Sequence, residues 1–191
     1  MNVLDAIETR RTIRKFTQEP LKEADLLKIV NAARLSAYGA NRQPLKYIII
    51  SEKESCAKVF PHTKWAGYLP DWDPSEGERP TAYIAILADS TIRPVKAADV
   101  DCGLAMTSMM LCAHELGIGS CAIGSIDREE LHALFELDDI YHVSYLLALG
   151  YPAQSGSYFD MIDDNIKYYH DDEGNVHVPK RTFNEVLIKK I

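Results

Sequence analysis

Three guanidinium groups and one hydroxyl lie within five residues in the segment Arg10-Arg11-Thr12-Ile13-Arg14, directly after a predicted helix. Guanidinium groups are forked donors that match the paired oxygens of a phosphate, and the Thr12 hydroxyl can add another hydrogen bond. If the segment is extended, Arg10, Thr12 and Arg14 point to one side and Arg11 points to the other. The segment is therefore a candidate phosphate-binding site, and the alternative is a solvated basic run on the surface.

Helical and strand-like patterns are mixed along the chain after this segment. Apolar spacing and capping residues predict helices over residues 3–9, 22–35, 53–60, 97–116 and 127–135. Short apolar runs predict strands over residues 47–51, 83–88, 120–123 and 145–149. A hairpin is expected near residues 167–178, and a last helix is expected after a capping box of Thr182 and Glu185. This mixture predicts an α+β fold in a single domain over residues 1–191.

The stretch from residue 61 to residue 80 has no regular pattern. It holds four prolines and two glycines, which predict an irregular loop. Trp65, Tyr68 and Trp72 lie in this loop, and aromatic side chains can stack on a flat substrate. The alternative is that they anchor the loop onto its own core.

The composition argues against several kinds of partner. Lys and Arg number 21 against 28 Asp and Glu, and the net charge of -7 argues against binding of nucleic acid through a basic face. The longest apolar runs, YIII and YLLAL, are too short to span a bilayer, so no membrane partner is expected. The first residues, MNVLDAIETRR, lack the pattern of a signal peptide, which favours a cytoplasmic location.

The cysteines and histidines show no metal-binding pattern. The four cysteines include no C-x-x-C pair and the six histidines include no H-E-x-x-H motif, so no metal site is expected. Free thiols fit better than a disulfide framework. The sequence also contains neither G-x-S-x-G nor a P-loop, which argues against an elbow-type serine hydrolase and a P-loop nucleotide-binding protein.

Two further segments carry candidate binding residues. The loop SAYGANRQP, residues 36–44, contains Asn41 and Gln43, whose amides each offer a donor and an acceptor to the polar edge of a heterocycle. The alternative is a plain helix-to-strand connection. The segment ELGIGSCAIG, residues 115–124, ends a helix and begins a strand, and its glycines permit a close backbone approach. Because these glycines precede the strand, the segment is not a dinucleotide-binding fingerprint.

In their order and spacing, these segments and LGYP at residues 149–152 resemble the nitroreductase family, and the match extends over residues 10–181. The resemblance implies that FMN is the cofactor and that NADH or NADPH is the electron donor. Leu45 stands where relatives often carry Trp, and Thr12 stands where they commonly carry Ser.

The resemblance also implies which residues contact the cofactor. A basic residue near the C-terminus is expected to return to the phosphate; Arg181 is favoured over Lys180, and the alternative for both is surface charge at a helix entry. The residues expected on the phosphate side are Arg10, Arg11, Thr12, Arg14, Lys180 and Arg181. Two groups are expected along the flavin. The first comes from the loop of the other subunit: Ser36, Ala37, Asn41 and Gln43. The second lies on the N5 side: Ala122, Ile123 and Gly124.

The fold and activity implied by the resemblance are specific. The resemblance implies an α+β sandwich with a central, mostly antiparallel sheet flanked by helices. It also implies an intertwined homodimer, and the helix at residues 97–116 is a candidate for the dimer core. The alternative is that this helix is buried within one chain. Trp65, Tyr68 and Trp72 would line the substrate pocket. Electrons would pass from NAD(P)H through flavin N5 to a nitroaromatic, quinone or enone by a ping-pong mechanism, with no side chain required for catalysis. The alternatives are a flavin-fragmenting enzyme, a reductive dehalogenase or a non-catalytic FMN-binding redox protein.

Overall fold

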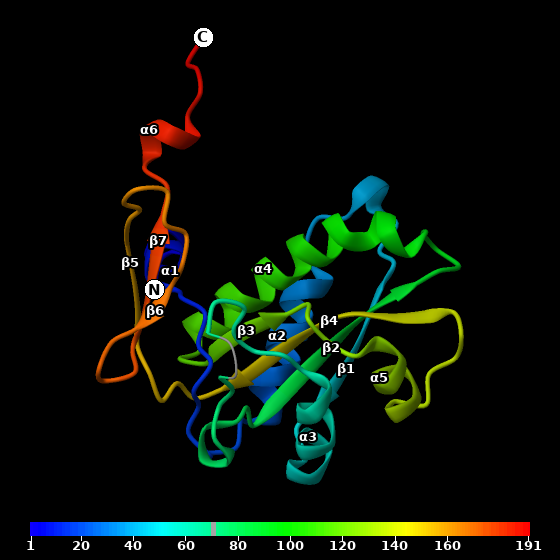
Figure 1. The fold of residues 1–191 in the computed structure, drawn as a ribbon. Coiled ribbons are helices and arrows are strands. Elements are labelled where there is room, and N and C mark those ends of the chain that lie inside the picture. Colours follow the sequence, from blue (N-terminus) through cyan, green and yellow to red (C-terminus); the bar gives the residue numbers. More distant parts are fainter. Residues whose placement is uncertain (70–71) are drawn as a thin grey trace.

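A four-stranded antiparallel sheet forms the centre of the computed structural model, which describes residues 1–69 and 72–191 (Figure 1). The strand order is β1 (Leu45–Ile50), β2 (Ala82–Asp89), β4 (Tyr141–Gly150) and β3 (Gly119–Ile123). Every residue of β2 is buried, because helices cover the sheet on both faces and the strand is apolar up to Asp89 at its end. This arrangement confirms the predicted α+β class and its antiparallel sheet.

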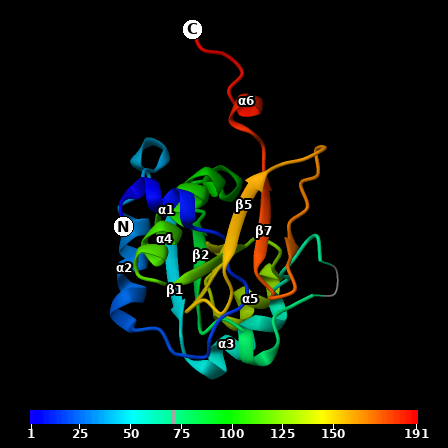
Figure 2. The same cartoon turned by 90° about the vertical axis from the view of Figure 1, so that its left-hand side faces the viewer.

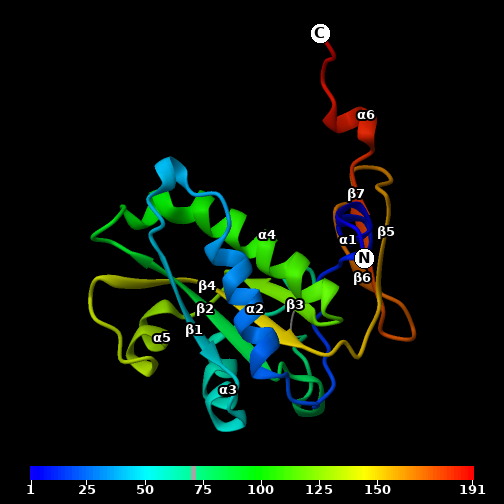
Figure 3. The ribbon, with the colours of Figure 1, turned by 180° about the vertical axis from the view of Figure 1, so that it is seen from behind.

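Two helices pack on each face of this sheet (Figures 1 and 3). The helices α2 (Glu23–Arg34) and α4 (Asp99–Glu115) share one apolar core with Ile84 of β2. The helices α3 (Lys53–Val59) and α5 (Arg128–Leu134) share the other core with the neighbouring residue Tyr83. Because successive residues of a strand point to opposite faces, β2 contributes to both cores, and so does β4.

The N-terminal segment runs from a short helix onto the edge of the sheet. Helix α1 (Val3–Thr9) begins at a capping box formed by Asn2 and Asp5. The chain then extends alongside β3, where the Ile13 amide donates to the Ser120 carbonyl at 3.0 Å. The segment that carries the arginines is therefore extended and lies at the β3 edge of the sheet.

A second sheet lies beside α1, in the order β5 (Gly156–Asp160), β7 (Val176–Lys180) and β6 (Tyr169–His170) (Figure 2). β6 and β7 are antiparallel, whereas β5 and β7 are parallel. The sequence patterns did not predict β5, because its partner β7 lies about twenty residues further along the chain and no local turn signals the pairing.

The boundaries of three other elements differ from the predictions. β4 begins at Tyr141, not at residue 145, because its first half pairs with the end of β2 beyond a register shift at Ile86/Leu87. The helix predicted from residue 97 begins as the 3-10 helix η4 (Val95–Ala98) and becomes α-helical at Asp99. The last helix, α6 (Phe183–Val186), is four residues long, and the Thr182 amide donates to Glu185 at its start.

Short 3-10 helices complete the connections: η1 (Gly39–Asn41), η2 (Phe60–His62) and η3 (Glu76–Glu78). The loop predicted over residues 61–80 is irregular where the structure describes it, and its residues 70–71 lie outside the described residues. Among the helices described, none has the length and apolar character needed to cross a membrane.

Candidate functional site

The Arg10 side chain lies against α4, where its Nη1 is 3.8 Å from the Met110 sulfur. Burial lowers the pKa of Arg10, and the positive charge of Arg11 lowers that pKa further. Within residues 1–69 and 72–191, no carboxylate forms an ion pair with Arg10, Arg11 or Arg14. Lys15, by contrast, pairs with Glu78 at 3.0 Å. The three guanidinium groups thus bring positive charge to one region without an acidic counterpart.

Arg11 is held by its own backbone neighbourhood. Its guanidinium donates to the carbonyls of Glu8 and Arg10, and its central carbon lies 4.6 Å from the ring centroid of Tyr158. Its Nε is buried and has no hydrogen-bond partner among the described residues. Burial lowers the pKa of this guanidinium, and Tyr158 opposes that change. An acceptor atom from a ligand would satisfy a group that this chain leaves unpaired.

Arg14 connects the basic segment with the loop that follows α3. Its Nε donates to the Trp65 carbonyl at 3.1 Å, and its guanidinium carbon lies 4.7 Å from the ring centroid of Tyr168. Thr12, two residues earlier, pairs with Ser120 of β3 in a parallel bridge. Thr12 and Arg14 are two residues apart in an extended segment, a spacing at which side chains leave on the same side.

The β3 residues expected beside the flavin divide into two kinds. Ala122 and Gly124 are exposed at the edge of the sheet, so their surface is open to a ligand. The Ile123 side chain is 3% exposed and belongs to the core, which leaves only its backbone for a contact. Gly119, at the start of the strand, permits the close packing of Ile13, whose side chain would lie 2.9 Å from an added Cβ.

Within one chain, the part of the loop around Gly39 lies away from Arg10, whereas Ser36, at the start of the loop, contacts Ser108 of α4. The Gly39 amide donates to Asp101 near the start of α4 at 2.8 Å, whereas Arg10 contacts Met110. Nine residues of α-helix separate these two contacts along α4, a distance of about 13 Å. Figure 1 shows the same separation, with η1 at one end of α4 and the N-terminal segment toward the other.

The side chains of this loop differ in their surroundings. Ser36 donates to the Ser108 hydroxyl at 2.7 Å and is partly buried, whereas Ala37 is exposed. Asn41 and Gln43 are exposed, with φ angles of 52° and 51°. These left-handed conformations are uncommon for residues other than glycine and are found more often at functional sites.

The basic pair near the C-terminus does not join the N-terminal arginines within one chain. Arg181 Nη1 lies 2.9 Å from Asp164 Oδ1 and 3.3 Å from Glu185 Oε1. Lys180 is opposite Asp160 at the end of β5, while Arg11 packs against Gly156 at its start. Within residues 1–69 and 72–191 of one copy, Arg181 thus contacts acidic residues of its own segment, whereas Arg10 and Arg14 contact Met110 and Trp65.

Trp65 is a core residue of the loop at residues 61–80. Its indole nitrogen donates to Thr63 Oγ1 at 2.9 Å, its ring stacks on Phe60 at 5.9 Å, and the residue is 6% exposed. The ring thus anchors the loop, and its backbone carbonyl, bound to Arg14, is the part that faces the basic segment.

Tyr68 and Trp72 lie closer to the surface. Tyr68 is 42% exposed and contacts the edge of Tyr168, with ring centroids 5.3 Å apart, and Trp72 contacts His170 at 5.1 Å. A cavity of about 590 Å³ borders Trp72 and reaches Ser125, directly after the exposed Gly124. The loop and the end of β3 therefore meet at one cavity.

The sequence interpretation missed Tyr158 and Tyr168, which lie against Arg11 and Arg14. These tyrosines are more than 140 residues from their arginines, so no local pattern shows the contacts. The only available signal was the presence of aromatic residues in the C-terminal third of the chain. Their rings place part of the second sheet and its connection beside the basic segment.

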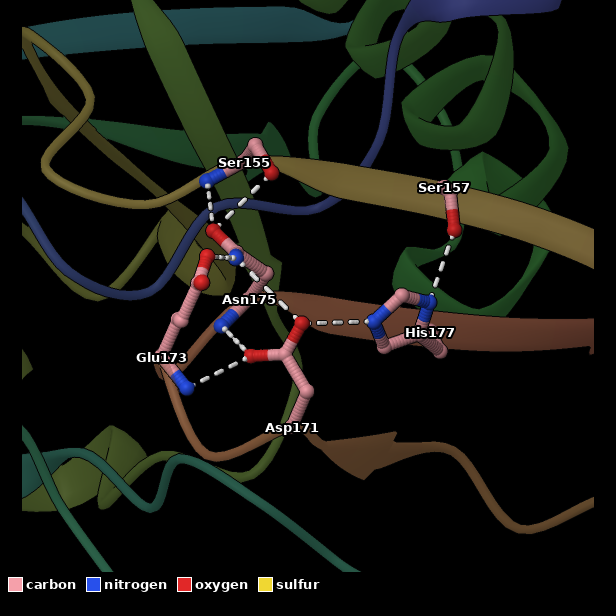
Figure 4. Close-up of polar contacts among 6 residues, drawn as sticks. All are labelled: Ser155, Ser157, Asp171, Glu173, Asn175 and His177. Carbon is pink, nitrogen blue, oxygen red and sulfur yellow. Dashed lines mark hydrogen bonds and ion pairs between the residues drawn. The ribbon is translucent and has the colours of Figure 1, made fainter.

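A chain of hydrogen bonds crosses the second sheet (Figure 4). Ser157 Oγ lies 2.8 Å from His177 Nδ1, and His177 Nε2 lies 2.9 Å from Asp171 Oδ2. Asp171 also accepts the amides of Glu173 and Asn175. Every one of these contacts joins β5, β7 or the turn between β6 and β7. We therefore assign this hydrogen-bond network a structural role. Among the described residues, neither this network nor any other part holds three His, Cys, Asp or Glu side chains grouped as metal ligands.

Comparison with known proteins places these features in a family context. The family model described as nitroreductase family matches residues 7–151. A Methanothermobacter thermautotrophicus protein, provisionally named NADH dehydrogenase/NAD(P)H nitroreductase, is 28% identical over 168 residues, covering 85% of this chain and 84% of the relative. The Bacillus subtilis FMN reductase (NAD(P)H) is 26% identical over 167 residues, covering 79% of this chain and 66% of the relative.

A solved structure shares the fold over the whole chain. It is the complex with FMN of a Desulfovibrio desulfuricans protein, provisionally named a nitroreductase. It is 23% identical, with a TM-score of 0.73, and the alignment covers 100% of this chain and 98% of that one. This likeness includes the second sheet and the C-terminal segment, which lie beyond the residues matched by the family model.

Proposed function

The chain belongs to the nitroreductase family, and from that premise we propose that it is an FMN-dependent oxidoreductase that takes electrons from NADH or NADPH. Two comparisons support the cofactor and the donor. The B. subtilis relative is named for FMN and NAD(P)H, and the D. desulfuricans neighbour is a complex with FMN. Family membership makes enzymatic redox chemistry the expected activity, and the arginine cluster is the place that we propose for its cofactor.

The observation that carries this proposal is the group of three guanidiniums without a carboxylate partner, at Arg10, Arg11 and Arg14. Burial and the charge of Arg11 disfavour the charged form of Arg10, so a bound dianion would relieve both effects. The buried Nε of Arg11 also lacks an acceptor in the described structure. A phosphate supplies both the charge and the acceptor atoms, so these residues fit the FMN phosphate.

Other residues of the β3 edge fit the remaining parts of the cofactor. Thr12 lies on the same side of the extended segment as Arg14 and offers a hydroxyl to the phosphate or the ribityl chain. Ala122 and Gly124 offer a smooth exposed edge against which a planar ring can lie. When bound, FMN supplies N5, which accepts a hydride from the nicotinamide and then passes electrons to the acceptor. The residues named here bind and orient the cofactor, and none of them is required as an acid or a base.

The second half of the site comes from another copy of the chain in this proposal. In one copy, the loop that contains Asn41 and Gln43 is distant from the Arg10 region. The same is true of the basic pair Lys180 and Arg181. A homodimer brings the loop of one copy to the arginines of the other. Exposed apolar residues support an interface; they include Val3, Leu4, Ile7, Val100, Leu104, Phe183 and Ile188.

The acceptor in this proposal is a flat, small organic molecule such as a nitroaromatic, a quinone or an enone. The cavity beside Trp72 and Ser125 adjoins the end of β3 and is about 590 Å³, within the range of roughly 300–1,000 Å³ for small-molecule sites. Tyr68 presents an exposed aromatic ring from the same loop. The nicotinamide that donates electrons and the organic molecule that accepts them would occupy the same cavity one after the other. This order is that of a ping-pong mechanism.

An anaerobic titration of the purified protein tests this function. The protein is loaded with FMN, mixed with NADH or NADPH, and followed by the loss of flavin absorbance near its visible maximum. Addition of a quinone should then restore the oxidised spectrum. Full reduction followed by reoxidation is the expected result, while bound FMN that neither nucleotide reduces would contradict the proposal.

A further inference from the structure

A second cavity, of about 340 Å³, lies on the α3 side of the sheet. It is bordered by α3, by the segment from Gln18 to Pro20 and by the residues that lead into β2. Its volume also lies within the range of small-molecule sites, roughly 300–1,000 Å³. Since β4 separates β2 from β3, this cavity is distinct from the edge that carries Ala122 and Gly124.

Three residues of this lining each carry a buried polar atom without a partner. The atoms are the Tyr83 hydroxyl, Thr81 Oγ1 and Arg79 Nε, and none of them has a hydrogen bond within residues 1–69 and 72–191. Tyr83 is 0% exposed, and Thr81 lies two residues earlier, so both side chains leave the chain on the same face. Buried polar groups in folded proteins are nearly always paired, so three unpaired ones at a single cavity indicate an occupant.

The backbone that carries these side chains is held on both sides. The Glu78 carbonyl accepts the Phe16 amide at 2.9 Å, and the Arg79 carbonyl accepts Gln18 Nε2 at 3.1 Å. The Thr81 amide donates to the Leu149 carbonyl at 3.1 Å. The backbone of this wall is therefore held in place without a ligand.

The open polar groups are all able to donate a hydrogen bond. The nearby carbonyls of Ile50 and Thr81 are already contacted by the Cys56 thiol, at 3.6 Å and 3.5 Å. Burial raises the pKa of the Cys56 thiol to about 11, so this thiol brings no negative charge to the cavity at neutral pH. The groups that remain are one N–H of the cationic Arg79 and the hydroxyls of Thr81 and Tyr83. Such a set matches a ligand with an anionic acceptor.

An apolar part of the lining lies beside these donors, while Gln18, Ser51, Lys53 and Glu76 add polar groups elsewhere around the cavity. The Arg79 guanidinium carbon lies 3.9 Å from the ring centroid of Phe60, which fixes the charge above an aromatic face. Pro20, Ala57 and Pro80 complete this part of the wall. An apolar wall favours a ligand with a compact hydrocarbon body. A single guanidinium balances one negative charge, and a buried dianion would keep an uncompensated charge.

We propose that this cavity binds a small organic monocarboxylate, with its carboxylate on Arg79, Thr81 and Tyr83 and its apolar body against Phe60. The exposed side chains of Lys53 and Glu76 stand on the solvent side of the cavity. The carboxylate accepts the three open donors, and the hydrocarbon part covers the aromatic and proline side chains. The site is independent of the FMN site and requires no redox step.

Benzoate is the ligand for the test, because it combines one carboxylate with a flat apolar body. It is titrated into the whole protein, with and without FMN, while the methyl NMR signals of Ala57, Thr81 and Ala122 are followed. The proposal expects saturable shifts of Ala57 and Thr81 with a dissociation constant of about 1 mM or below. The Ala122 signal reports binding at the flavin edge and is expected to stay unshifted in the FMN-loaded protein.

Variants identify the groups that bind. Tyr83→Phe and Arg79→Gln each remove one donor and should weaken benzoate binding about tenfold or more. Tyr169→Phe removes an exposed tyrosine hydroxyl outside the cavity and should leave the affinity unchanged. If either cavity variant does not fold, Ala57→Phe, which fills the cavity from the exposed side of α3, should abolish the Thr81 shift.

Several results would overturn the proposal. One is the absence of a saturable shift at Ala57 and Thr81 up to about 10 mM benzoate, which would mean that the cavity holds only water. A second is a shift confined to Ala122, which would assign benzoate to the flavin edge. A third is that inorganic phosphate binds at Ala57 and Thr81 more tightly than benzoate does. A fourth is an affinity for benzoate that is unchanged in Tyr83→Phe and in Arg79→Gln.

Discussion

Arg93 forms an ion pair with Asp101, a fully buried residue of α4, with Arg93 Nη1 2.9 Å from Asp101 Oδ2. The other carboxylate oxygen of Asp101 accepts the Gly39 amide at 2.8 Å. This one side chain therefore joins α4 to the loop that carries Asn41 and Gln43. The position of a loop proposed to reach the flavin of another subunit depends on a charge that, among the described residues, Arg93 alone balances.

Arg93→Met should be strongly destabilising, because it leaves the Asp101 carboxylate buried and unpaired. We expect the free energy of unfolding to fall by about 3–5 kcal/mol, measured by urea denaturation. The double variant Arg93→Met/Asp101→Leu should recover a large part of this loss, since it removes the buried charge as well. Arg42→Met, at an exposed arginine after η1, is the matched control and should change stability little. Equal stability of Arg93→Met and Arg42→Met would show that the pair has no such role.

Gly119→Ala should displace the basic segment from β3. The added methyl would meet the Ile13 side chain at 2.9–3.2 Å, closer than packed carbon atoms approach. We expect a loss of about 1–3 kcal/mol in stability and a weaker affinity for FMN. Gly103→Ala in α4 is the control, because its added methyl meets no atom within 4 Å. There the expected change is a gain of about 0.4–1 kcal/mol. An FMN affinity unaffected by Gly119→Ala would argue against a cofactor held by the segment that Ile13 anchors.

The proposed homodimer predicts a molar mass in solution of twice the 21.5 kDa chain. Val3, Leu4 and Ile7 form one exposed apolar stripe on α1, with exposed fractions of 70%, 70% and 54%. Leu4→Lys places a charge in that stripe and should shift the protein toward monomer in sedimentation or light-scattering measurements. Ile140→Lys, in the turn before β4, is the matched control. A wild-type protein that remains monomeric at micromolar concentration would contradict the dimer.

The turn between β6 and β7 should lose stability at low pH. Hydrogen bonding to His177, and then to the Asn175 amide, lowers the pKa of Asp171 from 3.8 to about 2. Because the folded-state pKa lies below the unfolded value, its contribution is complete above about pH 4 and is lost as the pH falls through about 2. Since a carboxylate only accepts hydrogen bonds, His177 Nε2 must carry the proton between them.

Amide hydrogen exchange of β7 between pH 5 and pH 2 measures this effect. After correction for the intrinsic rate, protection should decrease toward the lower pH in the wild type. The decrease should be absent in Asp171→Asn, which cannot titrate, and present in Asp172→Asn, which changes the neighbouring residue outside the network. A decrease of the same size in Asp171→Asn would assign the pH dependence to another group.

The sequence predicted the central fold well because its signals are local. Strands such as β2 are apolar on both faces, and the α5 cap at Asp127 accepts the Glu130 amide, as its spacing predicts. The small sheet is different. β5 pairs in parallel with β7 through a connection without a regular pattern, so its partner is chosen by tertiary packing.

The candidate site was predictable in its residue types, not in its geometry. An extended segment at Arg10–Arg14 was considered from the sequence, but its contact with β3 through Thr12 and Ser120 was not predicted. The distance of Asn41 and Arg181 from these arginines was not predictable either, because it depends on how α4 and β7 lie in space. Trp65 also shows the limit: an aromatic residue in a proline-rich loop looks the same in sequence whether its ring lines a pocket or fills a core.

The affinity for FMN compared with riboflavin tests most directly whether the arginine cluster holds a phosphate. The two ligands differ only in that phosphate, and their dissociation constants can be measured by fluorescence titration of the apoprotein. Charge-assisted hydrogen bonds contribute about 1.5–3 kcal/mol each, so wild-type protein should prefer FMN by at least about tenfold. Arg10→Gln should reduce this preference about tenfold without changing the affinity for riboflavin, whereas Arg34→Gln on α2 should leave both unchanged. Equal affinities for FMN and riboflavin in the wild type, or an unaltered preference in Arg10→Gln, would contradict the account.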